Sequence, residues 1–185
     1  MIPRWYGAVL AAVAAQRLRE LSISRRNSRA AAGSPSAPRT YPLIVAAHVA
    51  LLVLPPLEIR LANRRPTART ALPWLTVLAA ATALRWWSIR SLGASWNVRA
   101  EVPDNLEPVT SGPYRFVRHP NYLALLGEFV ALPMAGGAWL SAVGLSALNG
   151  AALAIRIRAE EAQLDRSGAY REAFGGKARL IPGVF

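Results

Sequence analysis

The sequence contains no cysteine and only two histidines, His48 and His119. The lack of cysteine excludes disulfide bonds, thiolate metal sites and cysteine nucleophiles, and two histidines alone do not make a zinc site. Lysine is almost absent as well, because Lys177 is the only lysine among 22 basic residues. We therefore expect no metal centre, and the excess of arginine is as consistent with genome composition as with function.

Charge and hydropathy suggest different partners for this chain. A formal net charge of +12 would, in a soluble domain, suggest nucleic acid. The arginines fall in the gaps between apolar runs, however, and 53% of the 185 residues are hydrophobic. This pattern predicts an all-α integral membrane protein with one domain, residues 1–185, which contacts membrane lipids and binds no nucleic acid.

Five apolar segments are candidate membrane spans, because about 20 apolar residues are needed to cross the hydrocarbon layer. Pro55 and Pro56 are expected to kink or end the second span. The sequence Leu-Pro-Met-Ala-Gly-Gly at 132–137 is expected to join the last two spans as a tight hairpin. The predicted spans are residues 2–18, 41–59, 72–89, 120–135 and 137–155.

Aromatic and charged residues at the span ends indicate where the membrane surface lies. Trp5 and Tyr6 are predicted to belong to an interfacial belt. Arg85 is predicted to snorkel toward the interface beside Trp86 and Trp87. The six tryptophans of the chain are interpreted mostly as belt and core residues.

The positive-inside rule assigns the connections to the two sides of the membrane. The connection at residues 17–40 is richer in arginine than the one after the second span, and we expect it to be flexible around residues 30–39. Residues 90–118 are too polar to lie in lipid and are predicted to form an exposed or protein-covered loop. The rule puts both segments and the tail at 156–185 in the cytoplasm, with the amino terminus outside.

Two charged or titratable residues inside the predicted spans need an explanation. His48 is interpreted as a packed histidine bonded to a backbone carbonyl rather than as a catalyst. Glu128 must face the bundle or a wet cavity, where it either pairs with an arginine or borders a cofactor site.

Two motifs flank the predicted hairpin: LEPVTSGPYRFVRHPNY at 106–122 and RIRAEEAQL at 156–164. Together they resemble the isoprenylcysteine carboxyl methyltransferase family, integral membrane enzymes that use S-adenosylmethionine. The family pattern is Gly-x-Tyr, then Arg-His-Pro-x-Tyr, then an arginine with two glutamates four and five residues on. All of these residues occur here at matching spacing. The resemblance covers residues 96–164 and implies that this region binds the cofactor.

The resemblance also implies roles for single residues. Arg156 matches the position that contacts substrate and is the predicted catalytic and substrate-binding residue, and Glu160 matches a cofactor ligand. Arg99 stands where the family has a glutamine on the cofactor, so this contact departs from the family pattern. The residues implied to bind S-adenosylmethionine are Arg99, Leu106, Glu107, Pro108, Val109, Tyr114, His119, Pro120, Asn121, Tyr122 and Glu160.

The chemistry of methyl transfer is compatible with these residue types. Transfer from a sulfonium requires a nucleophile aligned with the S–CH₃ bond, so positioning and exclusion of water carry most of the rate. A carboxylate or an acidic hydroxyl needs a cation that holds it without protonating it, which suits the guanidinium of Arg156. The alternative for Arg156 and Glu160 is a simple i, i+4 helix ion pair. Glu161 is expected to face solvent or an arginine of the loop.

The substrate and the class of protein leave alternatives open. The leading prediction is methylation of the carboxylate, or acidic hydroxyl, of a prenylated or long-chain lipid-like small molecule. Residues 17–27 and 41–48 resemble a bacterial subgroup that O-methylates long-chain alkylpyrones, which is the second candidate. The Arg-His-Pro-x-Tyr motif is also similar to a stretch of NADPH-dependent sterol reductases. A non-catalytic scaffold or transporter is the remaining alternative, and the oligomeric state is not predicted.

Overall fold

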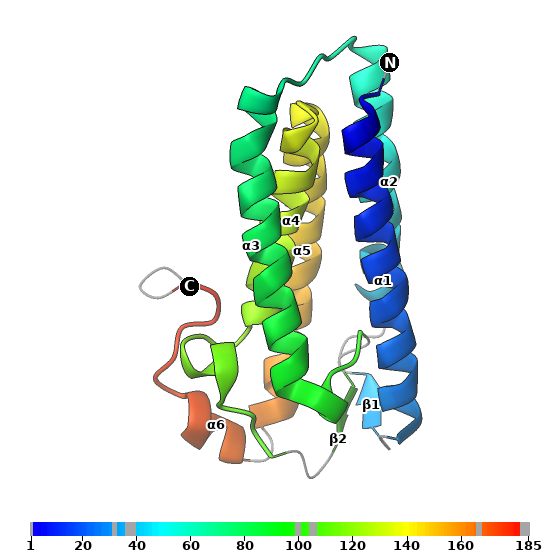
Figure 1. Ribbon diagram of the computed structural model, residues 1–185. Coiled ribbons are helices and arrows are strands. Elements are labelled where there is room, and N and C mark those ends of the chain that lie inside the picture. Colours follow the sequence, from blue (N-terminus) through cyan, green and yellow to red (C-terminus); the bar gives the residue numbers. More distant parts are fainter. Residues whose placement is uncertain are drawn as a thin grey trace.

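The computed structural model of the chain describes residues 2–30, 33–35, 40–98, 101–103, 107–165 and 168–181. Within these residues, long helices stand side by side and alternate in direction (Figure 1). They are α1 (Arg4–Ala30), α2 (Thr40–Leu61), α3 (Ala68–Leu92), α4 (Pro120–Ala135) and α5 (Trp139–Leu164). The shorter elements are β1 (Gly33–Pro35), η1 (Gly93–Ser95), β2 (Glu101–Pro103), η2 (Gly112–Arg115) and α6 (Ala169–Phe174).

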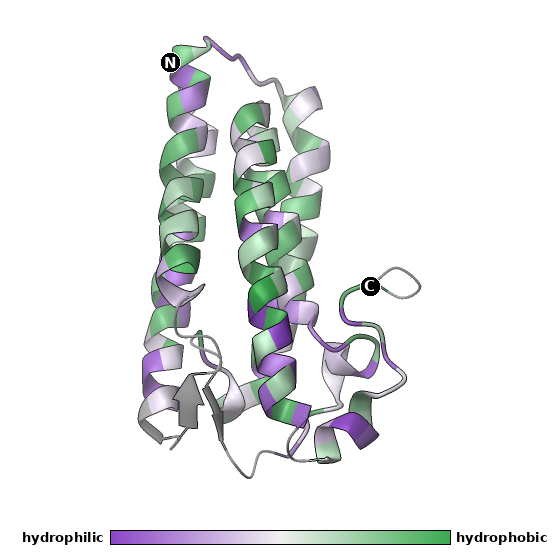
Figure 2. Ribbon diagram, turned by 180° about the vertical axis from the view of Figure 1, so that it is seen from behind, coloured by the Kyte–Doolittle hydropathy of each residue, from purple (hydrophilic) through white to green (hydrophobic). Residues whose placement is uncertain are grey.

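The alternation of the helices places the connections in two groups. The α2–α3 and α4–α5 turns lie at the same end of the bundle as the amino terminus (Figure 1). Strand β1, which lies between α1 and α2 in the chain, strand β2, which follows α3, and α6 lie at the opposite end. We call this second end the polar end, because hydrophilic residues gather there in Figure 2 while hydrophobic residues dominate along the helices.

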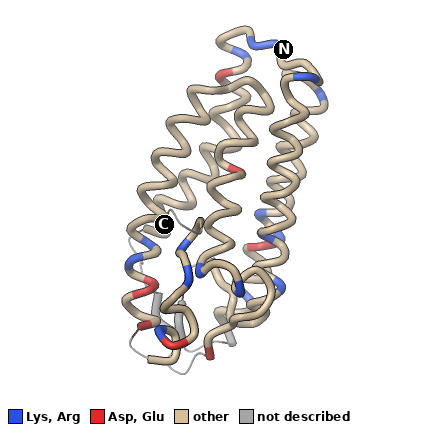
Figure 3. The backbone as a smooth tube through the Cα atoms, turned by 90° about the vertical axis from the view of Figure 1, so that its left-hand side faces the viewer, with Lys and Arg blue, Asp and Glu red and all other residues tan. Residues whose placement is uncertain are grey.

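Two of the described helices, α2 and α5, are long and apolar enough to cross a membrane. All five long helices correspond to the five predicted spans in order, but α4 has only 16 residues, fewer than the roughly 20 expected for a helix that crosses alone. Charged residues gather mainly toward the two ends of the bundle (Figure 3). These features agree with a membrane protein that has two candidate spanning helices, α2 and α5.

The fold is helical except for a small ribbon that the all-α prediction missed. Strands β1 and β2 pair in antiparallel fashion, with Ser34 opposite Val102. The strands have three residues each and contain proline or glycine, so hydrophobic periodicity gives no signal for them. The ribbon joins the α1–α2 connection to the α3–α4 segment at the polar end.

Helix α1 is longer than predicted, because residues 17–30 were assigned to the connection between the first two spans. The helix continues because residues on one of its faces are buried against the bundle in both halves, although these residues are apolar in the first half and polar in the second. Tyr6 and Val13 are buried in the first half, and Glu20 and Ser24 are buried in the second half. Asn27 ends the stripe by donating to the carbonyl oxygens of Gly93 and Trp96 at 3.0 and 2.6 Å. Hydrogen bonds thus replace apolar contacts in holding the second half.

Of the two outcomes expected at Pro55 and Pro56, a kink or an end of the span, the second is wrong, since α2 contains both prolines and runs to Leu61. The predicted hairpin is confirmed: α4 ends at Ala135 and α5 begins at Trp139. A β-carbon on Gly136 would stand 2.5 Å from a methyl carbon of Ile59 and within 3 Å of the Tyr6 ring. Glycine at this turn therefore lets three helices approach one another.

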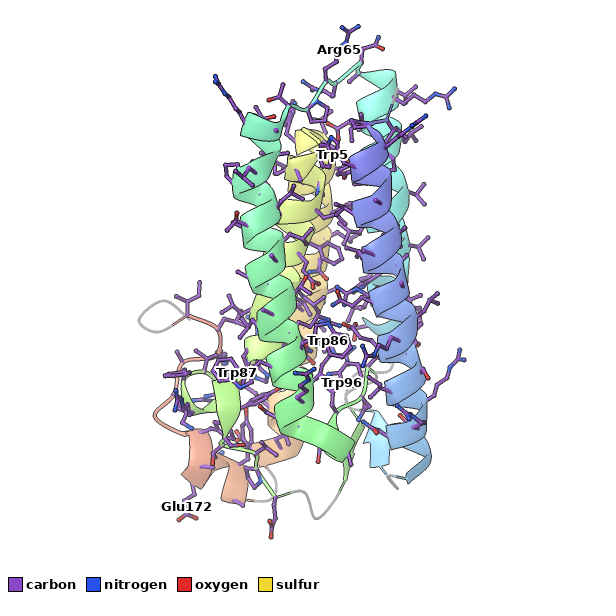
Figure 4. All side chains as sticks on the ribbon, viewed as in Figure 1. Trp5, Arg65, Trp86, Trp87, Trp96 and Glu172 are labelled. Carbon is purple, nitrogen blue, oxygen red and sulfur yellow. The ribbon has the colours of Figure 1, made fainter. Side chains whose placement is uncertain are left out.

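Figure 4 shows Trp5 toward one end of the bundle and Trp86, Trp87 and Trp96 toward the other. Tyr6, in contrast, does not belong to a surface belt. Its side chain is fully buried and its hydroxyl donates to the Leu132 carbonyl oxygen at 3.0 Å. Together with Phe129, Leu132, Leu51, Ile59 and Leu153 it belongs to the main apolar core.

Candidate functional site

A cavity of about 330 Å³ lies among the five long helices toward the polar end. Its walls are largely apolar, with Ala14, Leu18, Leu21, Ile44, Val45, Val49, Leu52, Leu125 and Leu153 among the lining residues. Leu18 and Val49 are also exposed, by 69% and 58%, so the cavity reaches the outer surface of the bundle between α1 and α2. Its polar lining residues are Arg17, Glu20, Tyr41, His48, Arg85, Asn97, Asn121, Tyr122 and Arg156.

Tyr122 connects this cavity to the glutamate of the second motif. The Tyr122 hydroxyl donates to a carboxylate oxygen of Glu160 at 2.5 Å and accepts a hydrogen bond from Arg156 Nε at 3.0 Å. Arg156 also donates through Nη2 to the Val98 carbonyl oxygen at 2.5 Å. The Val98 amide in turn donates to Ser24 Oγ at 3.0 Å. Arg156 and Glu160 are thus linked through a tyrosine rather than only as neighbours on one helix.

The buried charges inside the bundle form what we call the bundle cluster: Arg17, Glu20, Arg85 and Glu128. Arg85 donates from Nε and Nη2 to the two oxygens of Glu20, both at 2.7 Å, and Arg17 donates to Glu20 at 2.6 Å. Arg17 also pairs with Glu128. The two acids and Arg85 are almost completely buried. Arg85 therefore does not snorkel as predicted, because a carboxylate inside the bundle holds its guanidinium.

A second group of charges lies where the first motif meets the carboxyl-terminal segment, and we call it the tail cluster. Glu161 accepts from His119 Nε2 at 3.1 Å and from Arg179 Nε at 2.8 Å, and it lies 3.5 Å from Arg118 Nη1. The backbone amides of Arg118 and His119 donate to the carbonyl oxygens of Ala178 and Arg179, both at 2.9 Å. Glu161 is buried, so it faces loop arginines and not solvent.

His119 and Tyr122 stack, with ring centroids 5.4 Å apart and an angle of 26° between the planes. His119 therefore lies between Tyr122 and the tail cluster, and its Nε2 atom carries the proton donated to Glu161. Pro120 is buried in the first turn of α4, where a missing backbone N–H costs nothing. The Arg-His-Pro-x-Tyr motif thus joins the cavity to the carboxyl-terminal segment.

The Gly-x-Tyr motif forms η2, which packs against α3 and α6. Gly112 has φ +61°, and a β-carbon there would stand 2.1 Å from Ser91 Oγ, so only glycine fits. Tyr114 packs with Tyr170 and Phe174 of α6. Burial, reinforced by the negative charge of Glu160, raises the pKa of the Tyr114 hydroxyl. Tyr114 is therefore a neutral group at physiological pH.

The remaining predicted cofactor residues precede this motif. Glu107 is exposed, and Pro108 and Val109 are half-buried, with Val109 against the Tyr114 cluster. Arg99 and Leu106 lie outside the described residues, so their predicted roles remain predictions.

The two titratable residues singled out inside the spans are both accounted for. His48 Nδ1 lies 2.7 Å from the Ile44 carbonyl oxygen, and the ring packs edge-on against Phe129. This confirms a packed histidine bonded to its own helix. Glu128 pairs with Arg17, so the first alternative for this residue, pairing with an arginine, is confirmed.

Sequence reasoning missed Arg17, Glu20 and Arg85 as cavity-lining residues. Each lies at or beyond the end of a predicted span, where a charged residue is ordinary. The available signal was spacing: residues 13, 17, 20, 24 and 27 repeat at intervals of four and three, which puts them on one face of a continued helix.

Two comparisons with known proteins relate the chain to others. The uncharacterized protein YpbQ of Bacillus subtilis (strain 168) is 29% identical over 162 residues, which cover 84% of this chain and 94% of that protein. The model of the isoprenylcysteine carboxyl methyltransferase (ICMT) family matches residues 74–166, which include both sequence motifs and half of the chain. The chain therefore belongs to the isoprenylcysteine carboxyl methyltransferase family of membrane methyltransferases.

Proposed function

We propose that this protein is an S-adenosylmethionine-dependent O-methyltransferase that acts on the anionic head of a lipophilic molecule. The observation that carries the proposal is the position of Arg156. Its guanidinium is buried in the wall of an apolar cavity and is joined through the Tyr122 hydroxyl to Glu160. This arrangement offers a fixed cation to a head group and apolar walls to a tail.

Glu160 and the residues of the first motif suit the cofactor that the family uses. When bound, S-adenosylmethionine supplies a methyl group on a positively charged sulfur. Glu160 is half-buried, and the Tyr122 hydroxyl engages one of its two carboxylate oxygens. A carboxylate held this way can accept hydrogen bonds from an amine or a ribose diol through its other oxygen. Tyr114, His119, Pro120 and Tyr122 are the further residues that we propose to hold the cofactor.

Arg156 and the apolar walls of the cavity suit the substrate. Arg156 stays protonated, so it can orient a carboxylate or an enolate without removing the negative charge that makes the oxygen nucleophilic. Its Nε is already fixed by Tyr122, which limits the rotamers that it can adopt. The apolar walls can bury an alkyl or prenyl tail, at about 0.8 kcal/mol for each buried CH₂ group. The opening between α1 and α2 would let such a tail reach the cavity from the lipid.

An alkylpyrone with an acidic hydroxyl is the second candidate substrate, and one observation favours it. The segments that resemble the alkylpyrone-methylating subgroup, residues 17–27 and 41–48, both contribute to the cavity lining. They supply Arg17, Glu20, Leu21, Tyr41, Ile44 and His48 among others. Residues that distinguish the subgroup would therefore contact the head group or the first part of its tail.

We further propose five membrane spans with the polar end in the cytoplasm, where S-adenosylmethionine is made. The grouping of β1, β2 and α6 at one end agrees with this orientation (Figure 1). The amino terminus would then lie outside.

The proposal is tested by titrating the purified, detergent-solubilised protein with S-adenosylmethionine and with NADPH, followed by methyl-transfer assays. The assays use N-acetylated S-farnesylcysteine and a hydroxypyrone, and for each head group a series of analogues whose apolar tails differ in length. We expect binding of S-adenosylmethionine only, and rates that rise with tail length for the preferred head. The variant Arg156→Lys keeps the charge but loses the planar fork, so it should lose most of its activity.

The matched control is Arg158→Lys, an exposed residue on the same helix, which should leave activity unchanged. Binding of NADPH instead would favour a reductase. Full activity of Arg156→Lys on both the farnesylcysteine and the hydroxypyrone would show that Arg156 is only a structural partner of Tyr122 and Glu160.

A further inference from the structure

The hydrogen-bonding pattern of Arg85 fixes the orientation of the Asn121 side chain. Arg85 uses Nε and Nη2 for the two oxygens of Glu20, both at 2.7 Å. Its remaining nitrogen, Nη1, donates to Asn121 Oδ1 at 3.0 Å. A guanidinium has donors and no acceptor, so the amide atom that faces it must be the oxygen. The Nδ2 group of Asn121 must therefore point away from Arg85.

Asn121 is also one of the residues that line the cavity. Asn121 lies in the first turn of α4 and lines the cavity beside Tyr122 and Arg156. Among the described residues, no acceptor takes the hydrogens of Asn121 Nδ2. A half-buried donor of this kind is expected to find its acceptor in a ligand or a water molecule.

We propose that Asn121 recognises the head group of the substrate by donating a hydrogen bond from Nδ2 to an oxygen of that group. Arg85 is then the positioning residue that holds the amide in this orientation. This inference rests on the proposed function. It moves Asn121 from the cofactor side, where its motif would place it, to the substrate side.

The bundle cluster explains how a buried arginine can serve this purpose. The two arginines and the two glutamates cancel in formal charge, so the cluster presents no net charge to the cavity. The two-pronged contact with Glu20 holds Arg85 in one rotamer, and an uncompensated guanidinium at this depth would be strongly unfavourable. The neutral donor of Asn121 and the cation of Arg156 then line the same cavity, and together they suit a head group with two acceptor oxygens, one of them charged.

The test compares Asn121→Asp with the wild-type protein. Aspartate has nearly the same shape and can still accept from Arg85, but it turns a carboxylate oxygen toward the cavity in place of the amide donor. We expect KM for the farnesylcysteine and the hydroxypyrone to rise about tenfold or more, because a donor is lost and an anionic head is repelled. Affinity for S-adenosylmethionine and thermal stability should not change. Asn63→Asp, in the exposed turn at the other end of the bundle, is the control that should change nothing.

A double-mutant cycle tests the positioning role of Arg85. Arg85→Lys keeps the charge for Glu20 but cannot also hold Asn121 Oδ1, so KM should rise by a smaller factor than in Asn121→Asp. In an Asn121→Ala background, Arg85→Lys should no longer affect KM, because its effect passes through the amide. An effect of Arg85→Lys that persists in that background would show a purely structural role.

Two readouts separate failure of this inference from failure of the proposed function. Equilibrium binding of the labelled farnesylcysteine without cofactor reports on Asn121 even if no methyl group is transferred. Weaker binding of that probe by Asn121→Asp supports the inference, and unchanged binding overturns it. If Asn121→Asp instead weakens binding of S-adenosylmethionine, Asn121 belongs to the cofactor side and the inference is wrong.

Discussion

The bundle cluster and the tail cluster are both built on buried glutamates, yet they differ in their access to water. Glu20 and Glu128 lie between helices and are paired with Arg85 and Arg17. Glu161 lies at the polar end, and the side chain of its partner Arg179 is 39% exposed. The same carboxylate chemistry should therefore matter more inside the bundle, where water cannot replace a lost partner.

The two clusters also connect different parts of the molecule. The bundle cluster joins α1, α3 and α4, so it holds together three of the five long helices that form the cavity. The tail cluster joins the start of α4 to the end of α5 and to residues 177–179. The first is expected to support the global fold, and the second the local attachment of the carboxyl-terminal segment.

The largest effect is expected from Glu20→Ala. It leaves Arg85 buried without its carboxylate, and removing one partner of a buried pair costs about 3–5 kcal/mol. The measurement is the free energy of unfolding in mixed detergent micelles. Replacing both partners, as in Glu20→Leu with Arg85→Met, removes the uncompensated charge and should recover most of the loss. Equal destabilisation by the single and the double variants would contradict this account of the bundle cluster.

A smaller and more local effect is expected from Glu161→Gln. The amide keeps the shape of the side chain but loses the charge that holds His119, Arg118 and Arg179, which should cost about 1.5 kcal/mol. Hydrogen exchange should become faster at the Arg118 and His119 amides, which bond to the carboxyl-terminal segment. The control is Glu172→Gln, which alters an exposed side chain of α6 and should leave exchange unchanged (Figure 4). Faster exchange throughout the helices of the Glu161→Gln variant would refute a local role.

The smallest effect is expected from salt. Raising the salt concentration from about 0.1 to 1 M shortens the screening length from about 10 to 3 Å, which affects exposed charges and hardly reaches buried ones. Exchange at the Arg118 and His119 amides should therefore increase slightly with salt. Hydrogen exchange at the amides of α1 and α3 near the bundle cluster should not change with salt. Equal sensitivity at both places would mean that water reaches the bundle cluster as freely as the tail cluster.

The outcome for Arg85 shows where prediction from sequence was limited. An arginine followed by two tryptophans at the end of an apolar run is typical of a membrane surface, and snorkelling was the sensible prediction. Its partner Glu20 is 65 residues away in the chain, within a segment interpreted as the connection between the first two spans. The spacing of residues 13, 17, 20, 24 and 27 indicates one face of a continued helix, but it does not indicate which side chain of another helix that face meets.

The sequence by itself determined the membrane class, the order of the five long helices, the α4–α5 hairpin and the family, because apolar runs and short motifs are local properties. It also identified Arg156, Glu160 and Tyr122 as candidate site residues, since their spacing matches the family pattern. Only the tertiary structure decided that Tyr122 links Arg156 to Glu160, that Arg85 is buried against Glu20, and that Asn121 faces a cavity. These contacts join residues far apart in the chain, and which side chains meet there depends on how the helices pack.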